Sequence, residues 1–275
     1  MFAGYNEDKH MRTIQRVVLA LLLLTITTPA FATVRGKLES FPLQSRQFAT
    51  TYDVHVYLPP AYDPAKRYPV IYCTYDGVYF ERVPMVEAYE RALGGGAKEA
   101  VIIGIPDTPG YEGMPGFPEA DKYRTMVVEE LVPAVESRYS VAKDRAGRRL
   151  LGFSHGGVKL LNVVAAHPAV FSRIAMQSPG WLVWDKEYKK IEREIFDEAA
   201  AELRSAGSAL PTVWMTWGDG STEWESRSRK QGDRMAAILR GKDAEVTLGK
   251  LVKGDHGLDL ATQSFDEAFA FLLKD

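Results

Sequence analysis

The sequence predicts an α/β fold with a mostly parallel central sheet and helices on both of its faces. The segments YPVIYCTYDG (68–77) and EAVIIGIPD (99–107) contain continuous apolar runs, which are typical of strands buried on both sides. Segments with the helical spacing of apolar side chains alternate with such runs along the chain. Strands that alternate with helices favour parallel pairing through helical crossovers.

The predicted strands are marked by alternation or by continuous apolar runs. TTYDVHVYLPPAY (50–62) alternates and ends in Pro-Pro, which indicates an early, partly exposed strand. The other segments predicted to contain a strand, most of them running on into a loop, are 68–77, 99–107, 148–153, 171–180, 210–220 and 244–257.

The predicted helices carry apolar residues at helical spacing with charged residues between them. RTMVVEELVPAVESRY (124–139) has this pattern. A long charged amphipathic helix is predicted for DKEYKKIEREIFDEAAAELRSAG (185–207), which ends at a glycine. The remaining predicted helices are 156–167, 228–241 and 264–275.

Residues 1–32 have the pattern of a signal peptide, and residues 33–275 are expected to form a single domain. The apolar run VVLALLLLTITT follows three basic residues, Lys9, Arg12 and Arg16. It is short for a membrane span, and it is followed by the cleavage pattern Ala30-Phe31-Ala32. Met11 is a second candidate start. We expect a periplasmic or secreted protein without stable membrane insertion after cleavage, with a retained anchor as the alternative.

Composition and motifs exclude several classes of partner. The chain has 34 basic and 36 acidic residues, whereas a nucleic-acid surface requires a basic excess, so no nucleic acid is expected. The sequence contains no HExxH, CxxC, GxGxxG or P-loop pattern, so no metal and no cofactor are expected. Cys73 is the single cysteine, which excludes an intramolecular disulfide. The oligomeric state is left open.

Ser154 lies in the segment RRLLGFSHGGVKLL, between a predicted buried strand and a predicted helix. A turn sharp enough to project a serine there forces strained backbone angles and close packing of the helix on the strand. Small residues two before and two after the serine permit this, here Gly152 and Gly156. Ser154 is therefore the candidate nucleophile, with a structural turn carrying an incidental serine as the alternative.

A serine nucleophile needs a base, for which histidine is the usual residue. His10 lies in the predicted signal peptide, His55 in the early strand, and His167 at the end of a helix. His155 adjoins the serine on the helix side, so its side chain is expected to face away. His256, in the loop KGDHGLD after the last predicted strand, is therefore the candidate base.

The acid that orients the histidine is expected in the loop after TVWMTW, because on this arrangement the acid lies between nucleophile and histidine in the chain. Three carboxylates occur there, Asp219, Glu223 and Glu225. Asp219 is nearest the strand end and is the first choice, with Glu223 as the alternative acid. The oxyanion is expected to be held by the backbone N–H of His155 and by that of Gly77 or Val78.

These segments resemble the esterase D-like family of the α/β-hydrolase superfamily. The resemblance runs through residues 54–77, 129–180 and the segment GDHG. It includes the patterns Glu-Leu-x-Pro, Gly-x-Ser-x-Gly-Gly, His-Pro-x-x-Phe and Ser-Pro. It implies an α/β-hydrolase catalytic domain with Ser154 as nucleophile and His256 as base. The segment WGDGSTEWE departs from the commoner glycine-to-acid spacing of the family, so the acid stays open.

The expected function is that of an exported serine esterase that forms an acyl-enzyme on Ser154. The expected substrate is a small-molecule or oligosaccharide ester, either a carbohydrate ester or an aromatic-acyl ester. Trp181 and Trp184 are candidates for a stacking platform, with packing beneath the long charged helix as the alternative. The alternative functions are an enterochelin-type siderophore esterase and a non-hydrolytic acyl-transfer or binding module on the same fold.

Overall fold

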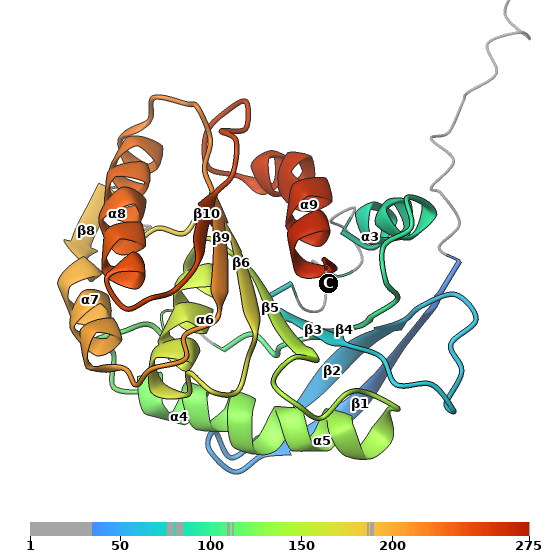
Figure 1. Ribbon diagram of the computed structural model, residues 1–275. Coiled ribbons are helices and arrows are strands. Elements are labelled where there is room, and N and C mark those ends of the chain that lie inside the picture. Colours follow the sequence, from blue (N-terminus) through green and yellow to red (C-terminus); the bar gives the residue numbers. More distant parts are fainter. Residues whose placement is uncertain are drawn as a thin grey trace, which may run out of the picture. The chain divides into compact units, whose positions relative to one another are not determined.

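An eight-stranded sheet forms the centre of the computed structural model, which describes residues 35–75, 80, 85–108, 111, 113–185, 187 and 190–274 (Figure 1). Its strands are β1 (Lys37–Ser45), β2 (Thr50–Leu58), β3 (Val70–Cys73), β4 (Val101–Gly104), β5 (Arg148–Phe153), β6 (Arg173–Gln177), β9 (Thr212–Thr216) and β10 (Val246–Leu248). They are ordered β1-β2-β4-β3-β5-β6-β9-β10. All pairs from β4 to β10 are parallel, whereas β2 is antiparallel to both β1 and β4.

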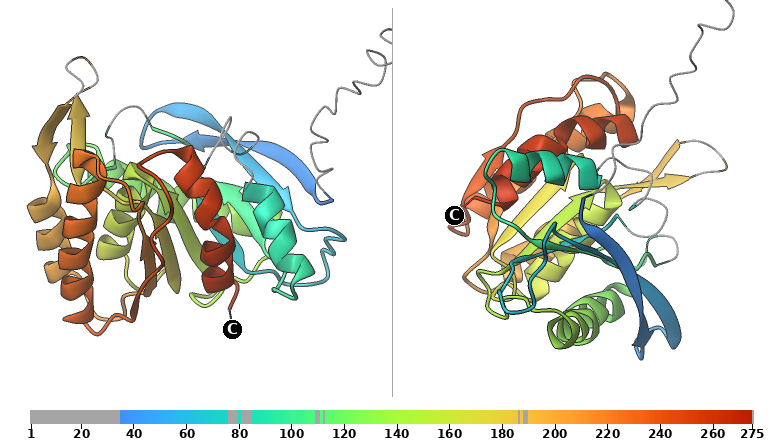
Figure 2. Two further views of the ribbon diagram at one scale, coloured as in Figure 1. Left: turned by 90° about the horizontal axis from the view of Figure 1, so that it is seen from above. Right: turned by 90° about the vertical axis from the view of Figure 1, so that its right-hand side faces the viewer.

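Helices cover both faces of this sheet, as Figures 1 and 2 show. They are α3 (Met85–Gly94), α4 (Ala120–Thr125), the π-helical turn η1 (Met126–Leu131), α5 (Val132–Arg138), α6 (His155–Ala166), α7 (Phe196–Ser205), α8 (Glu223–Arg240) and α9 (Leu258–Leu272). Ile71 and Cys73 of β3 join the buried cluster formed with α3 and α9, while Val70 and Tyr72 join the cluster formed with the other helices. The predicted fold class is confirmed.

The helix predicted for 124–139 is present and is longer than expected, because α4, η1 and α5 follow one another without a break. Pro133 in α5 has no N–H to donate to the carbonyl of Glu129, and the widened π turn lies just before it. Glu130 in that turn is buried and accepts hydrogen bonds from Ser45 Oγ (2.7 Å) and Arg46 N (3.0 Å). The helix is thereby tied to the end of β1.

The prediction of one long helix over 185–207 is wrong for the first half of that segment. β7 (Leu182–Asp185) and β8 (Lys190–Glu194) pair as an antiparallel two-stranded sheet, and the helix α7 begins only at Phe196. The charge pattern of this segment is compatible with either structure, and the pairing with the preceding segment decides between them. Ile195 N donates to Trp181 O (2.9 Å), which fixes the point where the strand gives way to the helix.

The last two helices begin earlier in the chain than predicted, α8 at Glu223 and α9 at Leu258. Thr222 caps α8, its Oγ1 accepting a hydrogen bond from Glu225 N (3.3 Å), so the helix begins at Glu223. α9 begins at Leu258, two residues after His256. The strand β1 and the helix α3 were not predicted.

Candidate active site

A strained turn between β5 and α6 holds Ser154 at the carboxyl edge of the sheet. Ser154 has φ 54°, in the left-handed region that residues with a side chain rarely adopt. A Cβ on Gly156 would lie 2.2 Å from Thr74 Oγ1, and a Cβ on Gly152 would lie 2.7 Å from Gly157 Cα. The two glycines therefore let helix and strand approach as closely as the sequence predicts.

His256 reaches Ser154 from the loop between β10 and α9. Ser154 Oγ lies 2.8 Å from His256 Nε2. The imidazole stacks on Phe153, with ring centroids 4.9 Å apart and planes 15° apart, and Trp224 packs against it at 5.1 Å. The structure thus brings together the two residues that the sequence singles out, and contacts with two aromatic rings restrict the orientation of the histidine.

The carboxylate beside His256 belongs to Glu225. Its Oε2 atom lies 3.7 Å from His256 Nδ1, and its side chain is completely buried. Glu225 is the third residue of α8, and the capped start of that helix directs it toward the histidine. The sequence pattern Thr222-x-x-Glu225 is the signature of a capped helix start and could have indicated this placement.

The placement of the acid expected from the sequence is thereby corrected. Asp219 Oδ1 accepts a hydrogen bond from Gly254 N (2.8 Å), so this carboxylate braces a loop. Glu223 is 71% exposed and pairs with Arg227 one turn along α8 (2.8 Å). Neither carboxylate is directed at the imidazole, because the chain enters α8 at Glu223 instead of continuing as a loop.

Ser178, at the end of β6, lies between the imidazole and the carboxylate. Its Oγ atom is 2.9 Å from His256 Nδ1 and 3.2 Å from Glu225 Oε2. Glu225 Oε1 also accepts a hydrogen bond from the backbone N–H of Gly218. The Ser178-Pro179 pattern indicates the end of a strand, and no role in the site was predicted for Ser178 from the sequence.

Two loops of the site are bonded to each other. Besides the contact of Asp219 with Gly254, Gly220 N donates to Gly254 O (2.8 Å). Asp255 Oδ1 accepts hydrogen bonds from Thr222 N (3.1 Å) and Thr222 Oγ1 (2.8 Å). The loop that leads to Glu225 and the loop that carries His256 are therefore held in a fixed relation.

Burial controls the protonation of both groups. Burial, and next the neighbouring His155, lower the pKa of His256 to about 4, so that its imidazole is neutral at pH 7. Burial raises the pKa of Glu225, and this shift is opposed by hydrogen bonds from Gly218 and Ser178. A neutral imidazole has a free lone pair at Nε2, the nitrogen that faces Ser154.

His155 is the first residue of α6, so its backbone N–H is one of those at a helix start without a partner in the helix. The positive end of the helix dipole lies at the same place. The side chain of His155 turns to Leu182 O (2.6 Å), and burial lowers its pKa to about 4. The other candidate oxyanion residues, Gly77 and Val78, lie outside the described residues.

Aromatic rings surround His155 next to Ser154. Trp224 contacts His155 (centroids 5.4 Å apart) and Trp184 (6.1 Å), and Tyr111 contacts His155 (5.1 Å). Tyr111 Oη is also bonded to the backbone of Trp184. Trp181 is completely buried, so its expected role as a stacking platform is corrected to packing in the core.

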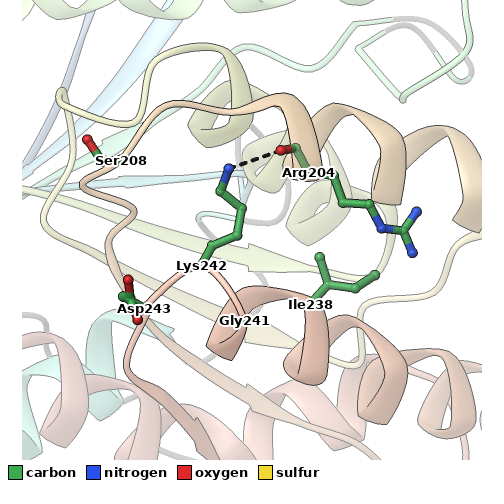
Figure 3. A pocket seen from close by; sticks show the side chains of 6 residues that line it. All are labelled: Arg204, Ser208, Ile238, Gly241, Lys242 and Asp243. Atoms are coloured by element: carbon green, nitrogen blue, oxygen red, sulfur yellow. Dashed lines mark hydrogen bonds between the residues drawn. The ribbon is translucent and has the colours of Figure 1, made fainter.

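None of these groups lines the hollow drawn in Figure 3. It lies at the C-terminal ends of α7 and α8, which topology places at the opposite edge of the sheet from Ser154. Its lining residues are Arg204, Ser208, Ile238, Gly241, Lys242 and Asp243. Lys242 Nζ donates to the carbonyls of Arg204 (3.0 Å) and Ala206 (2.5 Å), so its role here is to join two chain segments.

The described residues contain no group of three His, Cys, Asp or Glu side chains arranged to hold a metal ion. Within the same part of the chain, no helix is both long and apolar enough to cross a membrane. The predicted signal peptide, residues 1–32, lies outside it.

Comparisons with known proteins agree on family and fold. The family model described as "Putative esterase" matches residues 45–267. The uncharacterized protein YjcH of Bacillus subtilis strain 168 is 29% identical over 149 residues, which are 52% of this chain and 62% of that protein. The match therefore spans less than two thirds of that relative's length.

Two solved structures share the α/β-hydrolase fold with this chain. A ferulic acid esterase superimposes with a TM-score of 0.70 at 20% identity, covering 87% of this chain and 98% of that one. A ferulic acid esterase from Anaeromyces mucronatus, in complex with ferulic acid, superimposes with a TM-score of 0.64 at 19% identity, covering 84% and 89%. At these identities the likeness establishes the fold.

Proposed function

Because the chain belongs to the family described as "Putative esterase", we propose that it is a serine esterase that hydrolyses carboxylic esters through Ser154, His256 and Glu225. The observation that carries this proposal is the 2.8 Å contact between Ser154 Oγ, on its strained turn, and His256 Nε2. A serine in hydrogen-bond reach of a neutral, oriented imidazole is the arrangement of an activated nucleophile.

The first half of the reaction acylates the enzyme. Ser154 Oγ forms a bond to the ester carbonyl carbon while His256 Nε2 takes the hydroxyl proton, and Glu225 stabilises the imidazolium that results. The oxyanion is held by backbone N–H groups, for which His155 and the segment 77–78 are the candidates. The C–O bond to the leaving alcohol then breaks, and His256 returns the proton to that alcohol.

The second half releases the acid. A water molecule gives a proton to His256 Nε2 as its oxygen bonds to the acyl carbon. The bond between that carbon and Ser154 Oγ then breaks, and the proton passes to the serine. At pH 7 the imidazole of His256 is in the neutral form, which can accept a proton.

For the substrate, we favour an aromatic-acyl ester, such as a hydroxycinnamoyl ester of a carbohydrate. Trp184, Trp224 and Tyr111 supply flat apolar surface beside the reacting groups, and such surfaces suit aromatic rings. The similarity to a structure that binds ferulic acid agrees with this choice.

Export to the periplasm or the medium is also proposed, supported by the signal pattern of residues 1–32.

The experiment compares the wild-type protein with Ser154→Ala on p-nitrophenyl acetate, a feruloyl ester, acetylated xylan and a catecholate ester. We expect hydrolysis by the wild type, greatest on the feruloyl ester, and a loss of about 10³-fold or more in kcat for Ser154→Ala. Labelling by a fluorophosphonate should disappear with the same substitution, because the reagent bonds to an activated serine.

Two results would separate the alternatives. Full activity of Ser154→Ala would refute the proposed mechanism. A wild-type protein that is labelled at Ser154 but releases acid from none of the four esters would favour acyl transfer over hydrolysis, and a preference for the catecholate ester would favour a siderophore substrate.

A further inference from the structure

Ser178 has a backbone conformation that a serine adopts only at a cost. It has φ 43°, in the left-handed region, and it is completely buried at the end of β6, just before Pro179. Glycine is the residue that tolerates this conformation. A strained serine at a buried position suggests that its hydroxyl has a function.

The hydroxyl of Ser178 occupies the gap between two groups that do not reach each other. His256 Nδ1 and Glu225 Oε2 are 3.7 Å apart, beyond the distance of a hydrogen bond. Ser178 Oγ is 2.9 Å from the nitrogen and 3.2 Å from the same carboxylate oxygen. The short contacts between the histidine and its acid therefore run through the serine.

The direction of these hydrogen bonds follows from the chemistry of the groups. An ionised carboxylate only accepts, so the Ser178 O–H donates to Glu225. The oxygen of Ser178 then accepts from Nδ1–H of His256. A proton on Nδ1 leaves the lone pair of the neutral imidazole on Nε2, facing Ser154 Oγ at 2.8 Å.

We propose that Ser178 is a positioning residue that connects His256 to Glu225 and fixes the tautomer in which Nε2 can accept the proton of Ser154. The arrangement is a four-membered chain of Ser154, His256, Ser178 and Glu225, in which the acid acts through a hydroxyl. This inference rests on the proposed esterase function, since it assigns a role within the same site.

The test is steady-state hydrolysis of p-nitrophenyl acetate by the full chain with Ser178→Ala. We expect kcat to fall by about 10- to 100-fold with KM within about twofold of wild type, because the hydroxyl touches the histidine and not the substrate. Ser178→Gly removes the same hydroxyl and relieves the backbone strain. We expect it to keep the wild-type Tm and to show the same loss of kcat.

A matched control is Ser228→Ala on α8, one turn beyond Glu225. Its hydroxyl is also completely buried but has no hydrogen-bond partner among the described residues, so its removal should leave kcat unchanged.

A double-mutant comparison gives the second readout. If Ser178 and Glu225 act as one unit, Ser178→Ala with Glu225→Gln should be no more than about threefold worse than the more impaired single variant.

The outcomes distinguish this proposal from the one on which it rests. Wild-type kcat in either Ser178 variant, or single losses that multiply in the double variant, would overturn the role of Ser178 while Ser154→Ala still tests the esterase mechanism. Failure of Ser154→Ala to abolish hydrolysis would instead overturn the proposed function, whatever the Ser178 variants do.

Discussion

At the scale of single residues, the carboxylates after β9 differ sharply in surroundings, although they lie within a few positions of one another. We expect Glu225→Gln to lower kcat/KM by about 10²- to 10³-fold, because it removes the charge that stabilises the imidazolium. Glu223→Gln serves as the control, since that side chain is 71% exposed and pairs with Arg227 on the same helix. The measurement is kcat/KM for ester hydrolysis by the two purified variants. Equal values would contradict the assignment of Glu225 as the acid.

The sequence made the positions of Ser154 and His256 predictable because each depends on local signals. The serine lies between a buried strand and a helix with glycines on both sides, and four of the five histidines could be set aside by position. The position of the acid depends on where α8 begins, which a single capping threonine decides. The role of Ser178 depends on a distance across the sheet, which no local pattern contains.

At the scale of secondary-structure elements, the turn between β5 and α6 tolerates very little added volume. We expect Gly156→Ala to lower the free energy of unfolding by about 1–3 kcal/mol, because the new Cβ would meet Thr74 only 2.2 Å away. Gly94→Ala at the end of α3 adds the same methyl group to open space and should change stability by less than about 0.5 kcal/mol. Urea unfolding measures the free energy of unfolding of both variants. Equal values would contradict the prediction that the turn has no room for a side chain at Gly156.

The hairpin of β7 and β8 shows why an element can be missed even where its sequence is strongly patterned. The segment around Lys190–Glu194 is charged and suits the exposed face of a helix as well as an exposed strand. Its pairing partner, Leu182–Asp185, determines the outcome, and pairing is a tertiary property. Continuous apolar strands such as β3 were predictable because a strand that is buried on both faces consists almost entirely of apolar residues.

At the scale of the whole molecule, two partly buried histidines couple folding to pH. The pKa values of His155 and His256 are about 4 in the folded state, below the unfolded value of about 6.5. Between these pH values the unfolded chain binds more protons, so the free energy of unfolding falls as the pH is lowered. The raised pKa of Glu225 acts in the opposite direction. We expect a net loss on the order of a few kcal/mol between pH 7 and pH 4, measured by urea unfolding.

The control for this prediction is His155→Gln, whose side-chain amide can still donate to Leu182 O but does not titrate. In this variant the dependence of stability on pH should be shallower by about 1 kcal/mol per pH unit within the same window. An unchanged slope would show that the pKa of His155 does not differ between the folded and the unfolded state.

The hairpin of β7 and β8 has a consequence for how such an enzyme could diversify. It carries Trp184, which contacts Trp224 beside His256, whereas Ser154, Ser178, Glu225 and His256 all lie outside it. A hydrogen bond between the His155 side chain and the carbonyl of Leu182 joins the hairpin to the turn that carries Ser154. The hairpin can therefore change in length or sequence without altering these four residues, provided that the contact of His155 with Leu182 O is kept. Changes in the hairpin and changes in these four residues would therefore fall on separate stretches of the gene.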